Sequence, residues 1–325
     1  MQVTALEWVI TCVVILGLFV FDFFAHVRTP HEPTFRESGF WSAVYIGIAL
    51  AFGGFVAWRW GSTFAGEYYA GFVTEKALSV DNLFIFLIIM STFAVPRMYQ
   101  QKALLIGIVI ALVMRGVFIA VGAAAISAFS WVFYLFGLFL IYTAIKLVTE
   151  SGHEAEHEEK RDSRVVALAK RILPTTDSYD GDKLVTRMDG RRVVTPLLLA
   201  LLAIGFADLL FALDSIPAIY GLTSEPYLVF TANAFALMGL RQLYFLIGGL
   251  LDRLVYLSYG LSAILAFIGV KLVLHALHEN TLPFVNGGEH VSVPEISTGV
   301  SLGVIIGILV IATVASLLRT RARSS

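Results

Sequence analysis

Apolar residues gather along this chain into long runs that shorter polar stretches separate. Most of the runs hold about 20 residues, the length that an α-helix needs to cross a hydrocarbon core of roughly 30 Å. The pattern predicts an all-α membrane protein with nine transmembrane helices, at residues 4–24, 38–58, 66–93, 101–124, 129–149, 196–220, 227–250, 254–276 and 297–318.

The composition agrees with this interpretation. The 325 residues are 58% hydrophobic and 14% charged, whereas a soluble domain carries roughly 25% charged residues. A soluble globular class is thereby excluded, and we expect a lipid bilayer around the chain and no nucleic-acid partner. Cys12 is the single cysteine, which rules out intrachain disulfides and metal sites built from several thiolates.

The placement of the 23 Lys and Arg residues predicts the orientation. Under the nine-helix interpretation, seventeen of them fall on one side of the membrane, many in the loop between the fifth and sixth helices, and Arg59 alone falls on the other. Basic loops stay in the cytoplasm. The N-terminus is therefore expected outside and the C-terminus in the cytoplasm.

The third to fifth predicted helices resemble the sixth to eighth in sequence. "TEKALSVDNLFIFL" (74–87) aligns with "ADLLFALDSIPAIY" (207–220), which pairs Glu75 with Asp208 and Asp81 with Asp214. In the next two helices, Arg115 pairs with Arg241, and "AIKLV" (144–148) aligns with "GVKLV" (269–273). Each unit holds three spans, an odd number, so the second copy must enter from the opposite side. Such inverted repeats are typical of transporters, whose substrate site lies near the midplane between the copies.

The repeat divides the chain into five parts. The predicted divisions are two N-terminal helices (1–65), a first three-helix unit (66–149), a charged cytoplasmic loop (150–195), an inverted second unit (196–276), and an outer loop with the ninth helix and a basic tail (277–325). The loop is too polar for a span and shows too little apolar periodicity to indicate a domain.

Four carboxylates fall inside the predicted spans: Glu75, Asp81, Asp208 and Asp214. Unpaired, they would cost on the order of 10 kcal/mol on the insertion scale. Arg115 and Arg241 are the obvious partners, but two arginines leave a charge of −2, and counting Lys76 beside Glu75 still leaves −1. A residual charge near −2 suits one divalent cation or two protons. The neighbouring polar groups are hard oxygen donors that suit Mn²⁺, Mg²⁺ or Ca²⁺: Ser79, Asn82, Ser215 and Asn233.

The spacing of the carboxylates raises a geometric question. Residues six apart on a straight helix are separated by about 600°, so Asp208 and Asp214 would face different directions. Pro217 lacks an amide donor and disfavours helix at Ile216. We therefore expect the helix to break there, which would let both aspartates reach one cavity.

Several segments resemble signature sequences of the TerC/Alx family of bacterial integral membrane proteins: "EKALSVDNLFIF", "FALDSIPAIYGLT", "TANAFALMGLR" and "GVKLVL". The resemblance runs over nearly the whole chain. It implies a multi-pass protein of the bacterial cytoplasmic membrane that exports Mn²⁺, with Glu75, Asp81, Asp208 and Asp214 at the family's acidic motif positions. Many members carry a further glutamate where this chain has Gly205, a departure that bears on ligand number.

The sequence thus predicts a transporter, not an enzyme, that exports a divalent cation, Mn²⁺ foremost, in exchange for protons and without a permanent cofactor. Two alternatives stay open. One is a non-transporting membrane scaffold of a metal or tellurite stress complex that uses the long loop. The other is an exporter of amino acids or other small solutes, in which Arg115 or Arg241 would bind the substrate carboxylate. A third class, an intramembrane hydrolase with paired aspartates, fits the symmetric acidic pairs less well.

Overall fold

A computed structural model of the chain describes residues 1–27, 33–129, 131–150, 174–176, 178–188, 191–247, 256–280, 282 and 285–324. The side chains of Asp81, Phe84, Glu150 and Gly288 and of residues 321–324 lie outside that description. The described chain is predominantly helical. Its helices are α1 (Ala5–Asp22), which continues as the π-helical turn η1 (Phe23–Val27), α2 (Phe35–Trp60), α3 (Ser62–Thr92), α4 (Arg97–Ala128), α5 (Val132–Glu150), α7 (Pro196–Tyr220), α8 (Pro226–Leu237), α9 (Leu240–Ile247), α10 (Leu257–His278), the short 3-10 turn η3 (Asn286–Gly288) and α11 (Thr298–Ser324).

Seven of the described helices are long and apolar enough to cross a membrane: α1, α2, α4, α5, α7, α10 and α11. Two of the nine predicted spans are not among them. One is α3, which is long enough at 31 residues but carries Glu67, Glu75, Lys76 and Asp81. The other is residues 227–250, which the structure divides into α8 and α9. The chain is therefore a helical membrane protein with seven candidate spans in its described part.

The division between α8 and α9 lies at two residues. Met238 adopts an extended conformation (φ −60°, ψ 136°), and Gly239 has a φ of +75°. A positive φ is a conformation that glycine adopts at little cost and other residues avoid. The turn frees backbone carbonyls at the end of α8.

The predicted break at Pro217 is wrong. Helix α7 runs without interruption from Pro196 to Tyr220, with Pro217 inside its last turn. The proline removes the amide that would bond the Leu213 carbonyl, and the loss of this one bond does not interrupt the helix, which ends three residues later. Asp208 and Asp214 therefore stay on one continuous helix and face different directions.

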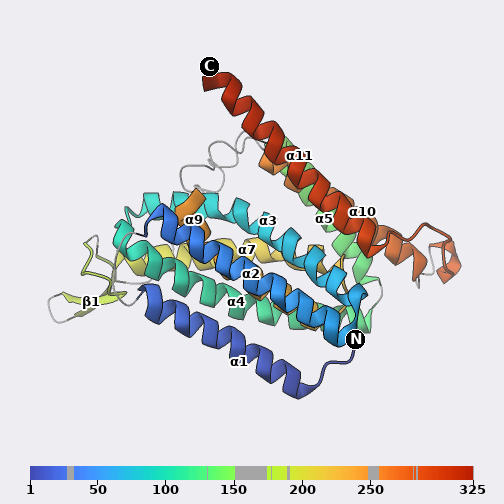
Figure 1. Cartoon of the computed structure of the whole chain (residues 1–325), viewed down its shortest axis with the longest axis horizontal. Coiled ribbons are helices and arrows are strands. Elements are labelled where there is room, and N and C mark those ends of the chain that lie inside the picture. The colour runs from blue at the N-terminus through green and yellow to red at the C-terminus, as the bar shows by residue number, and fades with distance from the viewer. Residues whose placement is uncertain are drawn as a thin grey trace.

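The helices form two groups (Figure 1). Helices α1, α2, α3, α4 and α7 run roughly side by side, and α5, α10 and α11 cross them obliquely. Helices α5 and α10 are antiparallel: Gly137 lies against Gly269, and seven residues further along α5 the carbonyl of Ala144 accepts a hydrogen bond of 2.7 Å from Ser262. A Cβ at Gly137 would lie 2.8 Å from the Gly269 carbonyl oxygen, so only glycine permits this approach.

The described part of the 150–195 loop contains a β-hairpin that the sequence interpretation missed. Strands β1 (Val185–Met188) and β2 (Arg191–Val194) pair antiparallel. The segment before them is held against the ends of α3 and α4: the Tyr179 hydroxyl donates to the Phe93 carbonyl (2.7 Å), and Lys102 contacts the Asp182 carboxylate (2.6 Å). The hydrogen bond from Lys102 lowers the pKa of Asp182.

Candidate cation-binding centre

The guanidinium of Arg115 lies at the centre of a buried polar cluster. It donates to Asp208 through two parallel hydrogen bonds (Nε to Oδ2, 3.0 Å; Nη2 to Oδ1, 2.9 Å). Its Nη1 donates to Glu75 Oε1, to Asn233 Oδ1 (2.7 Å) and to Ser215 Oγ (3.2 Å). Arg115, Glu75 and Asn233 are fully buried, and Asp208 and Ser215 are 1–2% exposed. We call these five residues the Arg115 centre.

The helices bring these side chains together from both three-helix units. Glu75 lies near the middle of α3, Arg115 near the middle of α4 and Asp208 near the middle of α7. Ser215 follows Asp208 by seven residues, about two helical turns, and so shares its face. Ser79, one turn after Glu75, is buried and donates to Glu75 Oε1 at 3.4 Å. The centre therefore occupies the middle of the bundle.

The charges of the Arg115 centre do not balance. Two carboxylates face one guanidinium, which leaves −1 when all three groups are ionised; Lys76 interacts electrostatically with Glu75 but donates its hydrogen bonds to backbone carbonyls. Glu75 Oε2 is buried and has no hydrogen-bond partner among the residues that the structure describes. A buried carboxylate oxygen without a partner is costly. A proton or a further cation at this oxygen would remove that cost.

Of the other two predicted carboxylates, Asp214 has its described contacts away from this centre. Asp214 accepts a hydrogen bond from Thr143 of α5 (3.1 Å) and interacts electrostatically with Lys146. The side chain of Asp81 lies outside the described residues, and the neighbouring Asn82 is buried in α3. Among the described residues, no three His, Cys, Asp or Glu side chains converge in a way that could hold a metal ion.

Lys76 binds the carbonyls that the turn between α8 and α9 releases. Its ammonium donates to the carbonyl oxygens of Ala236 (2.9 Å) and Met238 (3.3 Å). Carbonyls at a helix C-terminus carry partial negative charge and favour a cation. Lys76, the residue that follows Glu75 in α3, therefore stabilises the C-terminal end of α8.

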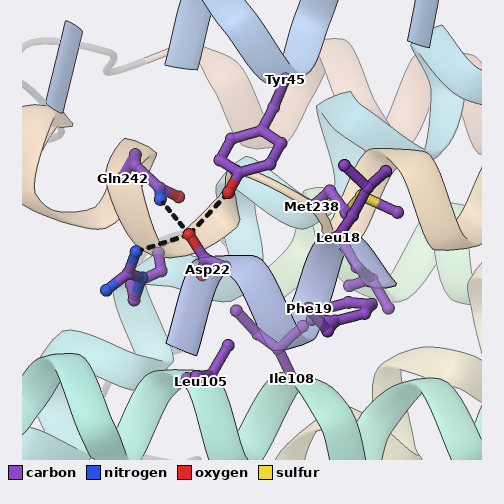
Figure 2. Close-up of a pocket in the computed structure, with 11 residues that line it drawn as sticks. Leu18, Phe19, Asp22, Tyr45, Leu105, Ile108, Met238 and Gln242 are labelled. Atoms are coloured by element: carbon purple, nitrogen blue, oxygen red, sulfur yellow. Dashed lines mark hydrogen bonds and ion pairs between the residues drawn. The ribbon is translucent and has the colours of Figure 1, made fainter. Parts of the chain in front are cut away.

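The predicted pairing of Arg241 with the acidic motif residues is wrong. Figure 2 shows Asp22 between Tyr45 and Gln242, and Arg241 lines the same cavity and donates to Asp22. Asp22 Oδ1 accepts from the Tyr45 hydroxyl (2.6 Å), Arg241 Nη2 (2.8 Å) and Gln242 Nε2 (3.1 Å). Arg241 Nη1 also donates to Gln101 (2.6 Å). We call these five residues the Asp22–Arg241 centre.

A small apolar-walled cavity adjoins the Asp22–Arg241 centre. Its volume is about 10 Å³, roughly the space of one water molecule. Arg241 Nε, a donor, and Gln242 Oε1, an acceptor, are buried without a hydrogen-bond partner among the described residues. A single water could satisfy both groups. Sequence reasoning missed this centre because Asp22 falls near a predicted helix end, although Arg241 in a span signals a buried partner.

Comparisons with known proteins agree with the fold and the motifs. The model of the integral membrane protein TerC family matches residues 60–324. An uncharacterized membrane protein of Mycobacterium tuberculosis is 53% identical over all of this chain and 82% of its own length. Alx of Escherichia coli, named as a proposed membrane-bound redox modulator, is 35% identical over 94% of this chain and 92% of its own.

A plant relative extends the comparison. The chloroplast thylakoid membrane protein TERC of Arabidopsis thaliana is 41% identical over 75% of this chain and 62% of its own length. No solved structure matches the chain. The family match covers most of the chain, including every residue of the Arg115 centre, and this chain belongs to the integral membrane protein TerC family.

Proposed function

We propose that this protein exports divalent metal cations, Mn²⁺ foremost, across the bacterial cytoplasmic membrane in exchange for protons. The observation that carries the proposal is the charge imbalance of the Arg115 centre. Two carboxylates share one guanidinium at the middle of an apolar helix bundle, and Glu75 Oε2 lacks a partner among the described residues. Ionisable groups at such depth are costly and mark ion pathways.

The donor chemistry supports a hard cation. Glu75, Asp208, Ser215 and Asn233 present carboxylate, hydroxyl and amide oxygens to one point. Oxygen ligands of this kind suit Mn²⁺, Mg²⁺ and Ca²⁺ better than softer metals. Only ionised carboxylates are good ligands, so protons compete with the metal. That competition supplies the coupling to protons.

An inverted repeat supports transport by alternating exposure of the centre. The sequence alignment makes Gly137 equivalent to Ser262 and Ala144 equivalent to Gly269. Replacing each residue by its repeat equivalent therefore turns the contact of Gly137 with Gly269 into the contact of Ser262 with Ala144. Both contacts lie between α5 and α10, which are antiparallel. In the repeat, α3 corresponds to α7 and α4 to α8 together with α9, so the packing of α3 against α8 corresponds to the packing of α7 against α4. Antiparallel equivalents are what a twofold axis in the membrane plane produces.

The proposed orientation has the N-terminus outside and the 150–195 loop in the cytoplasm. Ser224, between α7 and α8, and Ser178, in the described part of the loop, are both exposed. In a Cys12→Ser background, a membrane-impermeant thiol reagent should label Ser224→Cys in intact cells and Ser178→Cys only after lysis. The reverse pattern would contradict the export direction.

Export of amino acids is less well supported by this geometry. A carboxylate substrate needs an arginine with free donors. In the described structure, Arg115 donates to five oxygens, and the cavity beside Arg241 has room for about one water.

The proposed function is tested with purified protein in proteoliposomes, as Mn²⁺ flux with and without an imposed pH gradient. Glu75→Gln keeps the side-chain volume and removes one charge, and we expect at least about a hundredfold loss of flux, the size of effect that about 2.7 kcal/mol produces. Asp180→Asn, in the described part of the 150–195 loop with a side chain 43% exposed, is the matched control and should keep the wild-type rate. A well-folded Glu75→Gln protein with wild-type flux would overturn the proposal.

A further inference from the structure

We propose that the Arg115 guanidinium is a tethered cation that occupies the binding position of the transported metal and must withdraw before the metal binds. This inference rests on the proposed function and specifies how its site is regulated. The structure shows the guanidinium-filled state.

The first argument is that guanidinium and metal need the same atoms. Every oxygen that the Arg115 centre offers a metal accepts an N–H from Arg115, except Glu75 Oε2. The two Asp208 oxygens form the paired acceptor that the planar guanidinium fork matches. A metal with several ligands at 2.0–2.6 Å would need these lone pairs directed at itself. The two occupants are therefore mutually exclusive.

The second argument is electrostatic. The centre is buried, so a guanidinium and a divalent cation within a few ångströms of each other would repel strongly with little screening. With Arg115 present, Glu75 and Asp208 keep a charge of −1. With Arg115 withdrawn and a divalent cation bound, the same two carboxylates are neutralised. Arg115 thus offsets one of the two carboxylate charges and a divalent cation offsets both, and the repulsion between them allows one occupant at a time.

The third argument concerns the unloaded protein. Without Arg115, two buried carboxylates would face each other with no cation between them, and this repulsion would oppose the return of an empty transporter. Arg115 supplies a cation that cannot leave the protein. It therefore lowers the apparent metal affinity and permits net transport, because Arg115 together with one proton at Glu75 neutralises the unloaded centre.

The test is equilibrium Mn²⁺ binding to the purified protein, read from the electron paramagnetic resonance signal of free Mn²⁺. If the withdrawn state is populated at about 10%, Arg115→Gln should bind Mn²⁺ about tenfold more tightly than wild type, because removal of a competing state raises apparent affinity by the inverse of the competent fraction. Arg59→Gln removes an arginine from the exposed pair with Glu7 and should leave the affinity unchanged.

Transport supplies an independent readout. In proteoliposomes, Arg115→Gln should retain exchange of Mn²⁺ for Mn²⁺ across the membrane but lose net Mn²⁺ flux, because only the unloaded return step needs the tethered cation. Arg115→Lys keeps the charge but engages fewer oxygens than the fork. The Mn²⁺ affinity of Arg115→Lys should lie between those of wild type and Arg115→Gln. Arg115→Lys replaces Arg115→Gln in both tests if Arg115→Gln does not fold.

The outcomes separate the two proposals. Wild-type protein that neither binds nor transports Mn²⁺ or another divalent cation would overturn the proposed function itself. Wild-type binding with unchanged or weaker binding in folded Arg115→Gln, or in Arg115→Lys where only that variant folds, would leave the function standing and overturn the tethered-cation inference.

Discussion

The two arginines that the repeat makes equivalent, Arg115 and Arg241, lie in centres of different charge. Arg115 faces two carboxylates, Glu75 and Asp208. Arg241 forms an ion pair with Asp22 and a hydrogen bond with the uncharged Gln101. Glu37 acts on Arg241 electrostatically, although no direct ion pair joins these two residues in the described structure. Counting only the directly hydrogen-bonded groups, the Arg115 centre keeps a charge of −1 and the Asp22–Arg241 centre is neutral. A repeated motif therefore does not specify a repeated function, since the partners outside the motif decide the charge.

The difference has a structural origin. Asp22 comes from α1, a helix that lies outside the repeat, and it pairs with the arginine of the second unit. Asp208, the acidic residue of that unit, is thereby left to pair with Arg115 of the first. The asymmetric addition of α1 concentrates negative charge at the middle of the bundle. The Asp22–Arg241 centre joins α1, α2, α4 and α9 through hydrogen bonds, and we expect it to act in stability.

The largest expected difference between the centres is in transport. Asp208→Asn should reduce Mn²⁺ flux to the background of empty liposomes, because it removes a ligand charge and the paired acceptor of Arg115. Asp22→Asn should retain measurable flux. The comparison uses the initial rate of Mn²⁺ flux, divided by the amount of folded protein, in liposomes that contain equal amounts of each variant. Equal loss in both variants would contradict the division into a binding centre and a structural centre.

The second difference is in stability. Asp22→Asn leaves Arg241 buried without its carboxylate, a change that typically costs about 3–5 kcal/mol. We expect a large fall in the thermal unfolding midpoint in detergent and no change in Mn²⁺ affinity for the protein that remains folded. Added Mn²⁺ should raise the midpoint of wild type and of this variant alike. A shift in Mn²⁺ affinity would place Asp22 in the ion pathway.

The third prediction concerns the contact where the two units cross. Gly137→Ala places a Cβ 2.8 Å from a backbone oxygen of Gly269, and such overpacking typically costs about 1–3 kcal/mol. Gly47→Ala is the matched control, because a Cβ there meets nothing within 4 Å. Thermal unfolding in detergent measures both. Equal midpoints would show that α5 and α10 do not pack as closely as described.

Much of the Arg115 centre could be predicted from the sequence. Glu75, Arg115, Asp208, Ser215 and Asn233 were all identified, because ionisable and polar residues within apolar runs are few and the repeat aligns them. Their convergence depends on long-range packing of α3, α4, α7 and α8, which no local pattern encodes. The separate position of Asp214 follows from the six-residue spacing once α7 is continuous.

The errors have identifiable causes. Pro217 was given too much weight as a break, because the loss of one amide donor does not interrupt α7 before its end at Tyr220. The real break is at Gly239, where only the backbone conformation distinguishes this glycine from the packing glycines of other spans. The β-hairpin had a signal that was missed: Asp189-Gly190 between two β-branched segments is typical of a two-residue turn. The inverted repeat stays a prediction that the packing supports.

The smallest expected effect lies outside the membrane, at the contact of Lys102 with Asp182, whose side chain is 43% exposed. The pair lowers the pKa of Asp182, so its stabilisation is present above the unfolded-state pKa near 3.9 and is lost as pH falls through the lower folded-state value. An exposed pair contributes about 0.2–1 kcal/mol.

Asp182→Asn should therefore speed amide hydrogen exchange of β1 by up to about fivefold at pH 7. The difference from wild type should vanish in acid below the folded-state pKa. Lys183→Met, which removes the exposed pair with Asp180, should change exchange less. Identical exchange in wild type and Asp182→Asn at pH 7 would show that this contact does not hold the hairpin segment against α4.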